Sequence, residues 1–184
     1  IWVVDPIDGT ASFSAGLPVW GVAIALLEAG ESVAGFFYAP VTGDLIHTTS
    51  EGRVVRNGRI REINRPGPLH RESSLFIDSR LHKYYTISRS YPGKLRNLAS
   101  AAAHLSYVAT GSADAALIER VYVWDIAAGM AMLKANGGTL TYLNGPPVDL
   151  APLLSGDPTP RPLMAGHPET VAKFTELIKF HEDE

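Results

Sequence analysis

The first part of the chain consists of short apolar runs that are separated by turn residues. This pattern predicts strands at residues 17–28, 32–39 and 44–49 and a hairpin over 53–61 that turns at Asn57-Gly58. Ala29-Gly30-Glu31 supplies the turn between the first two strands. Consecutive hairpins of this kind predict an antiparallel sheet.

A Pro- and Gly-rich stretch, residues 65–68, has the composition of a linker. We place a boundary there, between a first half at 1–65 and a second half at 66–184. Beyond the boundary we expect strands at 75–77, 107–110, 139–143 and 162–165 and helices at 94–104, 126–136 and 169–180, while 113–119 fits either an extended or a helical segment. This alternation predicts an α/β fold whose second sheet is mainly parallel and carries helices on its faces.

The chain opens with an apolar run that ends in a polar turn, IWVVDPIDGT. Asp5 and Asp8 stand close together on this turn, with the carbonyl of Ile7 between them. Two carboxylates and a carbonyl are hard oxygen ligands that suit Mg²⁺ or Ca²⁺. The same residue types, Asp, Pro and Gly, also occur in turns for purely local reasons, so a turn without a ligand explains this stretch equally well.

A second acidic residue, Asp125, follows another apolar run at 121–124 and precedes the Ala-rich segment 126–136. We expect a strand that ends at Asp125 and a helix that starts after it. Asp125 could be a metal ligand or simply the residue that caps this helix. The small residues at 127–129 fit either a ligand site or a tight contact between helix and sheet.

These two segments together resemble the motifs of the inositol monophosphatase family of Mg²⁺-dependent phosphatases. Residues 2–13 match its motif W-x-x-D-P-[IL]-D-G-T-x-N-F, except that Ser12 replaces the asparagine, and residues 124–129 match its motif W-D-x-A-A-G. The resemblance implies an αβαβα sugar-phosphatase sandwich, here without its N-terminal helical layer. The family's G-E-E motif, whose glutamate binds metal, does not occur in the chain.

The resemblance also implies a role for each site residue. Asp5 would bridge two metal ions, Asp8 and Asp125 would hold the second ion, and the carbonyl of Ile7 would hold the first. Asp5 and Thr10 would be the catalytic residues. Because one metal-binding glutamate has no counterpart, we expect weakened metal binding and little turnover by this chain alone.

Substrate would be bound by the amides of Gly9 and Thr10, which would hold the phosphate. Thr10 would also orient the attacking water through its hydroxyl. Glu119 would contact substrate hydroxyls. It stands six positions before Asp125, where the family commonly has a spacing of seven, and an equally good alternative is that Glu119 is simply an acid on the surface. Leu98-Ala99-Ser100-Ala101 replaces a turn that starts with glycine in the family, and Ala99 adopts positive φ less readily than glycine does.

The chain begins with Ile inside a predicted strand, so we expect it to be a piece of a longer protein. Without a preceding layer, the apolar faces of Trp2, Val4, Trp20 and Val22 should be uncovered. Such a surface would allow a different function, in which the chain is a non-catalytic module that binds a partner.

Composition excludes several other classes of protein. The net charge of −3 gives no electrostatic reason to bind nucleic acid or an anionic membrane, and the absence of cysteine excludes thiolate chemistry. The longest apolar run, residues 17–27, is too short to span a bilayer. Five arginines between 53 and 65 could form a phosphate patch, but we interpret them as a solvated hairpin.

We therefore predict a cytoplasmic, homodimeric Mg²⁺-dependent phosphatase that hydrolyses a small polyol or sugar phosphate such as inositol monophosphate. Fructose bisphosphate, histidinol phosphate and a nucleotide bisphosphate remain alternative substrates, because the motifs do not separate them.

Overall fold

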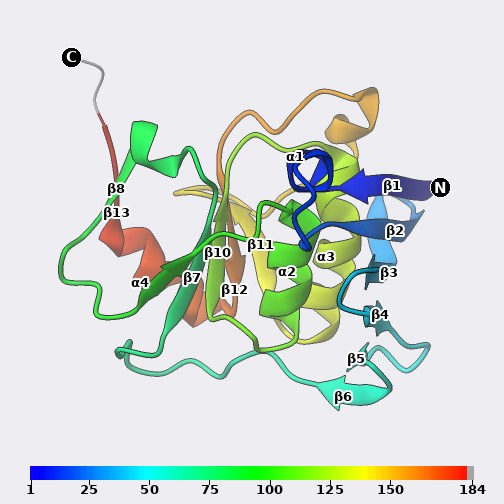
Figure 1. Cartoon of the computed structure of the whole chain (residues 1–184), viewed down its shortest axis with the longest axis horizontal. Helices are drawn as coiled ribbons and strands as arrows, with labels where there is room; N and C mark the ends of the chain where they lie inside the picture. Colours follow the sequence, from blue (N-terminus) through cyan, green and yellow to red (C-terminus); the bar gives the residue numbers. More distant parts are fainter. Residues whose placement is uncertain (182–184) are drawn as a thin grey trace.

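The computed structural model describes residues 1–181, which contain two main sheets with helices packed between them (Figure 1). The first sheet is antiparallel and follows chain order: β1 (Trp2–Asp8), β2 (Gly21–Glu28), β3 (Glu31–Ala39), β4 (Asp44–Thr48), β5 (Val54–Arg56) and β6 (Arg59–Arg61). The predicted hairpins are confirmed, including the turn at Asn57-Gly58, where both residues have positive φ. All six strands precede residue 62.

The second sheet is mixed: four of its five strands run in the same direction, in line with the predicted mainly parallel sheet, and one strand runs against them. Its order is β11 (Thr139–Tyr142), β12 (Leu163–Gly166), β10 (Ala115–Ile118), β7 (Ser74–Ile77) and β9 (Lys94–Arg96). β7 runs parallel to β10 and β9, whereas β12 runs antiparallel to both of its neighbours. The reason is that the chain returns from β11 through a loop without a crossover helix, and it then enters between β11 and β10 in the opposite direction.

Two helices form the layer between the sheets: α2 (Ala101–Ala109) and α3 (Val123–Ala135) (Figure 1). The remaining elements are α1 (Thr10–Ser14), α4 (Pro168–Leu177), 3-10 turns at Leu81–Lys83 and Pro152–Ser155, and a small sheet of β8 (Tyr85–Ile87) and β13 (Ile178–Phe180). α4 packs on β12 and β10. No helix in the described part of the chain is long and apolar enough to cross a membrane.

Several predicted elements differ from those in the structure. The helix expected at 94–104 begins only at Ala101, because the side chain of Ser100 caps it by accepting the Ala103 N–H at 3.1 Å. The strand expected at 107–110 is the last turn of α2, where the burial of Val108 outweighs its preference for strands. The last helix ends at Leu177, since the following three residues pair with β8.

Small residues allow α3 to lie close to both of its neighbours. A Cβ atom at Gly35 of β3 would overlap the backbone of Ala128, and one at Gly129 would overlap Leu105 of α2. The hydroxyl of Ser32 also donates to the carbonyl of Ala127 at 2.7 Å in a buried position. Close packing therefore explains the small residues after Asp125 without a ligand.

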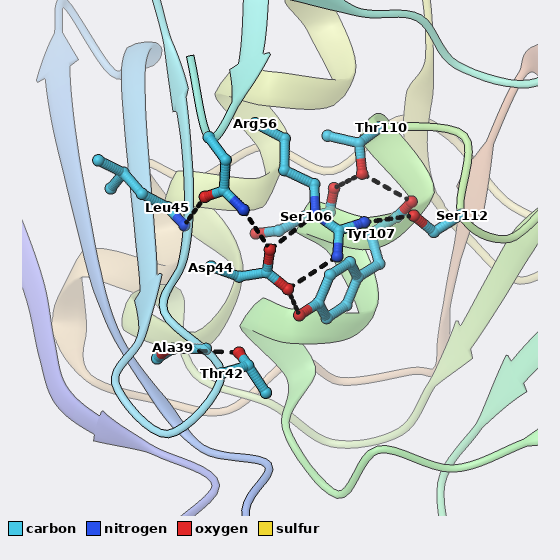
Figure 2. A network of polar contacts seen from close by, with 10 residues as sticks. Ala39, Thr42, Asp44, Leu45, Arg56, Ser106, Tyr107, Thr110 and Ser112 are labelled. Carbon is cyan, nitrogen blue, oxygen red and sulfur yellow. Dashed lines mark hydrogen bonds and ion pairs between the residues drawn. The ribbon is translucent and has the colours of Figure 1, made fainter. Parts of the chain in front are cut away.

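A polar network ties the β4–β5 hairpin to α2 (Figure 2). Arg56 donates to both carboxylate oxygens of Asp44, at 2.9 and 2.7 Å, and to Ser112 at 3.0 Å. Tyr107 of α2 donates to Asp44 at 2.7 Å, and Asn57 donates to it at 2.8 Å. Arg56 thus has a structural role, while the other four arginines of the hairpin region are exposed to solvent as predicted.

Candidate metal centre

Asp5 lies within β1 and Asp8 is the last residue of this strand, so neither stands on a free turn. The pairing of β1 with β2 is irregular between Asp5 and Asp8, where Pro6 has no N–H to donate. Asp5 accepts a hydrogen bond from the N–H of Ile7 at 2.9 Å, which fixes its carboxylate. Gly9 then has φ of +84°, and a Cβ atom there would lie 3.1 Å from the carbonyl oxygen of Ala99. This stretch is therefore held firmly against the start of α2.

Asp125 is the third residue of α3, so the strand predicted to end there is wrong. Its carboxylate accepts the N–H of Tyr122 at 2.7 Å and so helps to cap the helix, but Tyr122 is the N-cap residue. The structure brings Asp125 to Asp5 and Asp8: one oxygen from each of the three carboxylates lies within 4.8 Å of the others. The convergence that the two motifs predict is thus present.

The three carboxylates crowd negative charge into a buried place. Burial raises the pKa of Asp8 to about 7, and the charges of Asp125 and Asp5 add to this effect, while a hydrogen bond from Ser100 opposes it. Burial likewise raises the pKa of Asp125 to about 7, with a further contribution from Asp5. No lysine or arginine among residues 1–181 forms an ion pair with any of the three.

This donor set fits a divalent metal ion. Carboxylate oxygens are the ligands that Mg²⁺ and Ca²⁺ prefer, and such an ion would supply the positive charge that the centre lacks. Within the described residues, the cluster includes no cysteine or histidine that would select a softer metal.

A polar pocket of about 670 Å³ opens beside the metal centre. Asp8, Gly9, Thr10, Glu119 and Asp125 all line this pocket, so the structure brings the predicted substrate contacts together with two of the aspartates. The side chain of Glu119 is half-buried, and its pKa is raised by burial and by a neighbouring carboxylate. Its role as a contact for substrate hydroxyls stays a prediction.

Sequence reasoning gave no role to several polar residues of this pocket, among them Ser100 and Asp78. Ser100 donates its hydroxyl to Asp8, whose carboxylate also accepts the Ala102 N–H at 3.2 Å. Ala99, just before Ser100, has φ of +55°, a conformation that glycine would adopt at a lower energetic cost.

Asp78 lines the pocket at the end of β7. The signal for Asp78 was an acid directly after an apolar strand, the same signal that identified Asp5.

Comparison with known proteins places the chain in a family. The model of the inositol monophosphatase family matches residues 1–176, and the chain belongs to this family. It is 30% identical over 148 residues to the fructose-1,6-bisphosphatase/inositol-1-monophosphatase of Thermotoga maritima, which covers 79% of this chain and 57% of that protein. It is 34% identical over 153 residues to the Nus factor SuhB of Xylella fastidiosa, covering 79% of this chain and 56% of that protein.

The fold agrees with this family. Inositol monophosphatase II from Staphylococcus aureus superimposes with a TM-score of 0.81 at 24% identity, over 95% of this chain and 66% of that one. The chain thus spans little more than half the length of the two curated relatives and two-thirds of this structure. An α/β fold with mixed sheets is shared between them.

Proposed function

We propose that this chain carries the metal centre of a Mg²⁺-dependent phosphatase that hydrolyses a small polyol or sugar phosphate monoester. The observation that carries the proposal is the meeting of three carboxylates from β1 and α3 beside the Gly9 turn and a polar pocket. Membership of the inositol monophosphatase family supports phosphatase chemistry in general. The relatives bear names of different activities, so the substrate is part of the proposal.

In this proposal, Asp5, Asp8 and Asp125, together with the carbonyl of Ile7, hold the metal. When bound, Mg²⁺ would neutralise the phosphate, polarise a water molecule and stabilise the leaving oxygen. Asp5 is positioned for this by the N–H of Ile7, and Asp125 by the N–H of Tyr122. Both carboxylates keep further lone pairs with which to bind a cation.

The substrate's phosphate would lie against the N–H groups of Gly9 and Thr10, because the first N–H groups of a helix have no partner within it. The hydroxyl of Thr10, which lines the pocket, would orient the attacking water. Glu119 would accept hydrogen bonds from the substrate's hydroxyls. These assignments follow the family motifs and agree with the lining of the pocket.

The test is phosphate release from inositol 1-phosphate, measured for this chain and for any longer chain that contains it, with Mg²⁺ and with EDTA. Calorimetric titration with Mg²⁺ gives a second readout that does not need turnover. We expect Mg²⁺ binding that Asp125→Asn weakens, and metal-dependent release. Release that EDTA leaves unchanged, or the absence of both binding and release, would contradict the proposal.

One observation favours a second function, an interaction surface on the outer face of the first sheet. Trp2 and Val4 are 69% and 49% exposed, whereas Trp20 and Val22 are half-buried. Val4 lies in register with Ile24 on β2 and, through it, with the exposed Phe36 on β3. A homodimer would cover such a face.

Sedimentation over a hundredfold range of protein concentration tests this surface. We expect self-association that weakens when Trp2 and Phe36 are replaced by serine. A species that stays monomeric at the highest concentration would contradict the homodimer.

A further inference from the structure

Asp78 stands on a wall of the pocket and takes no part in the metal centre described above. It follows β7, which lies next to β10 in the second sheet, and its side chain is partly exposed to the pocket. One of its carboxylate oxygens accepts the backbone N–H of Glu119 at 2.6 Å. Asp78 and Glu119 therefore sit side by side at the ends of neighbouring strands and line the same cavity.

A buried histidine that does not line the pocket lies close to Asp78. His104 of α2 is fully buried and stacks on Phe76, with ring centroids 5.0 Å apart. Its Nε2 accepts the N–H of Leu98 at 2.9 Å, so the proton of the neutral ring is on Nδ1. Nδ1 lies 3.9 Å from the second oxygen of Asp78 and has no hydrogen-bond partner among residues 1–181.

Asp78 and His104 therefore do not form a metal site together. Asp78 is instead available as an acceptor of hydrogen bonds. The Nδ1 that faces Asp78 carries a proton and so has no lone pair for a metal ion. One oxygen of Asp78 is engaged by the Glu119 N–H, and the other is near His104 but not bonded to it. An ionised carboxylate has several acceptor sites, and part of Asp78 remains open to the pocket.

We propose that Asp78 is a specificity-determining residue that, together with the carboxylate of Glu119, accepts hydrogen bonds from hydroxyl groups on the uncharged polyol part of the substrate. The inference rests on the proposed phosphatase function, because it takes the phosphate to lie at Gly9 and Thr10. Two neighbouring carboxylates suit a pair of hydroxyl donors and disfavour a second phosphate at the same wall.

Two arginines on the same pocket suggest the competing substrate class. Arg80 and Arg120 line the cavity, and neither forms an ion pair in the described part of the chain. Arg80 is close enough to lower the pKa of both Asp78 and Glu119, so part of its charge is already balanced there. A bisphosphate held by these arginines is the alternative that the experiment must distinguish.

The experiment compares Asp78→Asn with the wild-type chain for two ligands, inositol 1-phosphate and ethyl phosphate, in the presence of Mg²⁺. The amide that replaces the carboxylate keeps an oxygen that can accept the Glu119 N–H, so the backbone contact is preserved. Asp149→Asn is the matched control, because Asp149 is exposed and does not line the pocket. Affinity is measured by calorimetry or, where turnover occurs, as KM with kcat recorded separately.

We expect Asp78→Asn to weaken inositol 1-phosphate about tenfold, the usual effect of losing a hydrogen bond to a charged group. Ethyl phosphate, which has no hydroxyl at this wall, should change less than twofold, and Asp149→Asn should change neither ligand. An equal loss for both ligands would assign Asp78 a merely structural role and overturn the proposal.

Two further outcomes also decide against Asp78. Tighter binding of fructose 1,6-bisphosphate than of inositol 1-phosphate, lost in Arg80→Ala, would overturn the polyol preference and leave the phosphatase function intact. If neither phosphate ester nor inorganic phosphate binds with Mg²⁺ present, the proposed function fails, and the role of Asp78 fails with it.

Discussion

The protein buries aspartates in two places, and their pKa values are shifted in opposite directions. Asp44 is 8% exposed and accepts hydrogen bonds from Arg56, Tyr107 and Asn57, so its pKa is held below the ordinary value. Asp8 is 4% exposed, receives hydrogen bonds from Ser100 and a backbone N–H, and has a pKa raised to about 7. Neither side chain is much exposed, but Asp8 lies deeper in the protein, so loss of solvation raises its pKa and two further carboxylates add to the effect, whereas the hydrogen bonds and the charge of Arg56 lower the pKa of Asp44.

This difference separates a structural cluster from a functional one. In the Asp44 network (Figure 2) every charge has an opposite partner, and the network holds the β4–β5 hairpin to α2. In the metal centre, carboxylates surround one another, which costs stability in the absence of a cation. Unbalanced buried charge of this kind marks sites that bind something.

The largest expected effect comes from Asp8→Asn. We expect Mg²⁺ affinity to fall by about a hundredfold or more, because a direct ligand is lost and even indirect supports of a ligand contribute tenfold to a hundredfold. The thermal midpoint of the metal-free chain should rise at pH 8, since one of three crowded charges is removed. Calorimetric titration and thermal unfolding of the same sample measure the two effects. A lower thermal midpoint with unchanged Mg²⁺ affinity would show that Asp8 is a structural residue like Asp44.

Asp44→Asn makes the same chemical change in the other cluster and should have the opposite result. Breaking this partly buried ion pair leaves Arg56 without a charged partner, which we expect to lower the free energy of unfolding by about 1 to 2 kcal/mol. Mg²⁺ affinity should be unchanged. Urea unfolding gives the stability, and Tyr107→Phe, which removes a single hydroxyl from the network, should cost about 1 kcal/mol. Equal stability of wild type and Asp44→Asn would contradict the structural role.

The sequence indicated the cluster of three aspartates far better than it indicated the Asp44 network. Asp5 and Asp8 stand in one short motif and Asp125 in another, so the local sequence was sufficient to select them. The network instead depends on positions 44, 56 and 107, which meet only after the hairpin has packed on α2. No local pattern indicates which of several arginines finds a carboxylate.

The same difference between local and long-range determinants explains which parts of the fold could be predicted from the sequence. The hairpins were predictable because their turn residues and strand periods are local. The position of β12 was not, because it depends on where a loop carries the chain after β11. Ala-rich residues at 99–103 continued the helical pattern, but the start of α2 is fixed by the cap at Ser100, which lies against Asp8 from the other end of the sequence.

The pH dependence of stability should show both clusters at once. The pKa of Asp8 and Asp125 is raised in the folded chain, so their contribution to stability is fully present below pH 3.8 and is lost as pH rises to about 7. The pKa of Asp44 is lowered, so its contribution is present above pH 3.8 and lost as pH falls through the folded value. Without metal, the thermal midpoint should therefore decrease between pH 4 and 7.

Mg²⁺ should reverse this decrease, because the ion binds the ionised carboxylates. The increase in thermal midpoint on adding Mg²⁺ should be larger at pH 8 than at pH 5. The Asp8→Asn variant serves as the control, and it should show a smaller decrease with pH and little response to Mg²⁺. An equal response to Mg²⁺ at both pH values would place the ion elsewhere.

The smallest expected effect tests whether backbone strain also separates the two regions. Ala99, in the pocket, and Ala29, in the β2–β3 turn, have φ of +55° and +51°. Glycine adopts this conformation without the cost of a Cβ atom, so Ala99→Gly and Ala29→Gly should each raise the free energy of unfolding by about 1 kcal/mol.

Ligand binding should then distinguish the two alanines. Ala99→Gly loosens the backbone that presses on Gly9 and precedes Ser100, so it should change the affinity for Mg²⁺ or phosphate by about twofold to threefold, whereas Ala29→Gly should leave both unchanged. Urea unfolding and calorimetric titration of the paired variants measure the two effects. If Ala99→Gly gains stability with no change in binding, the strain there is the same local turn strain as at Ala29, and only the unbalanced charge of the aspartates distinguishes the site from the scaffold.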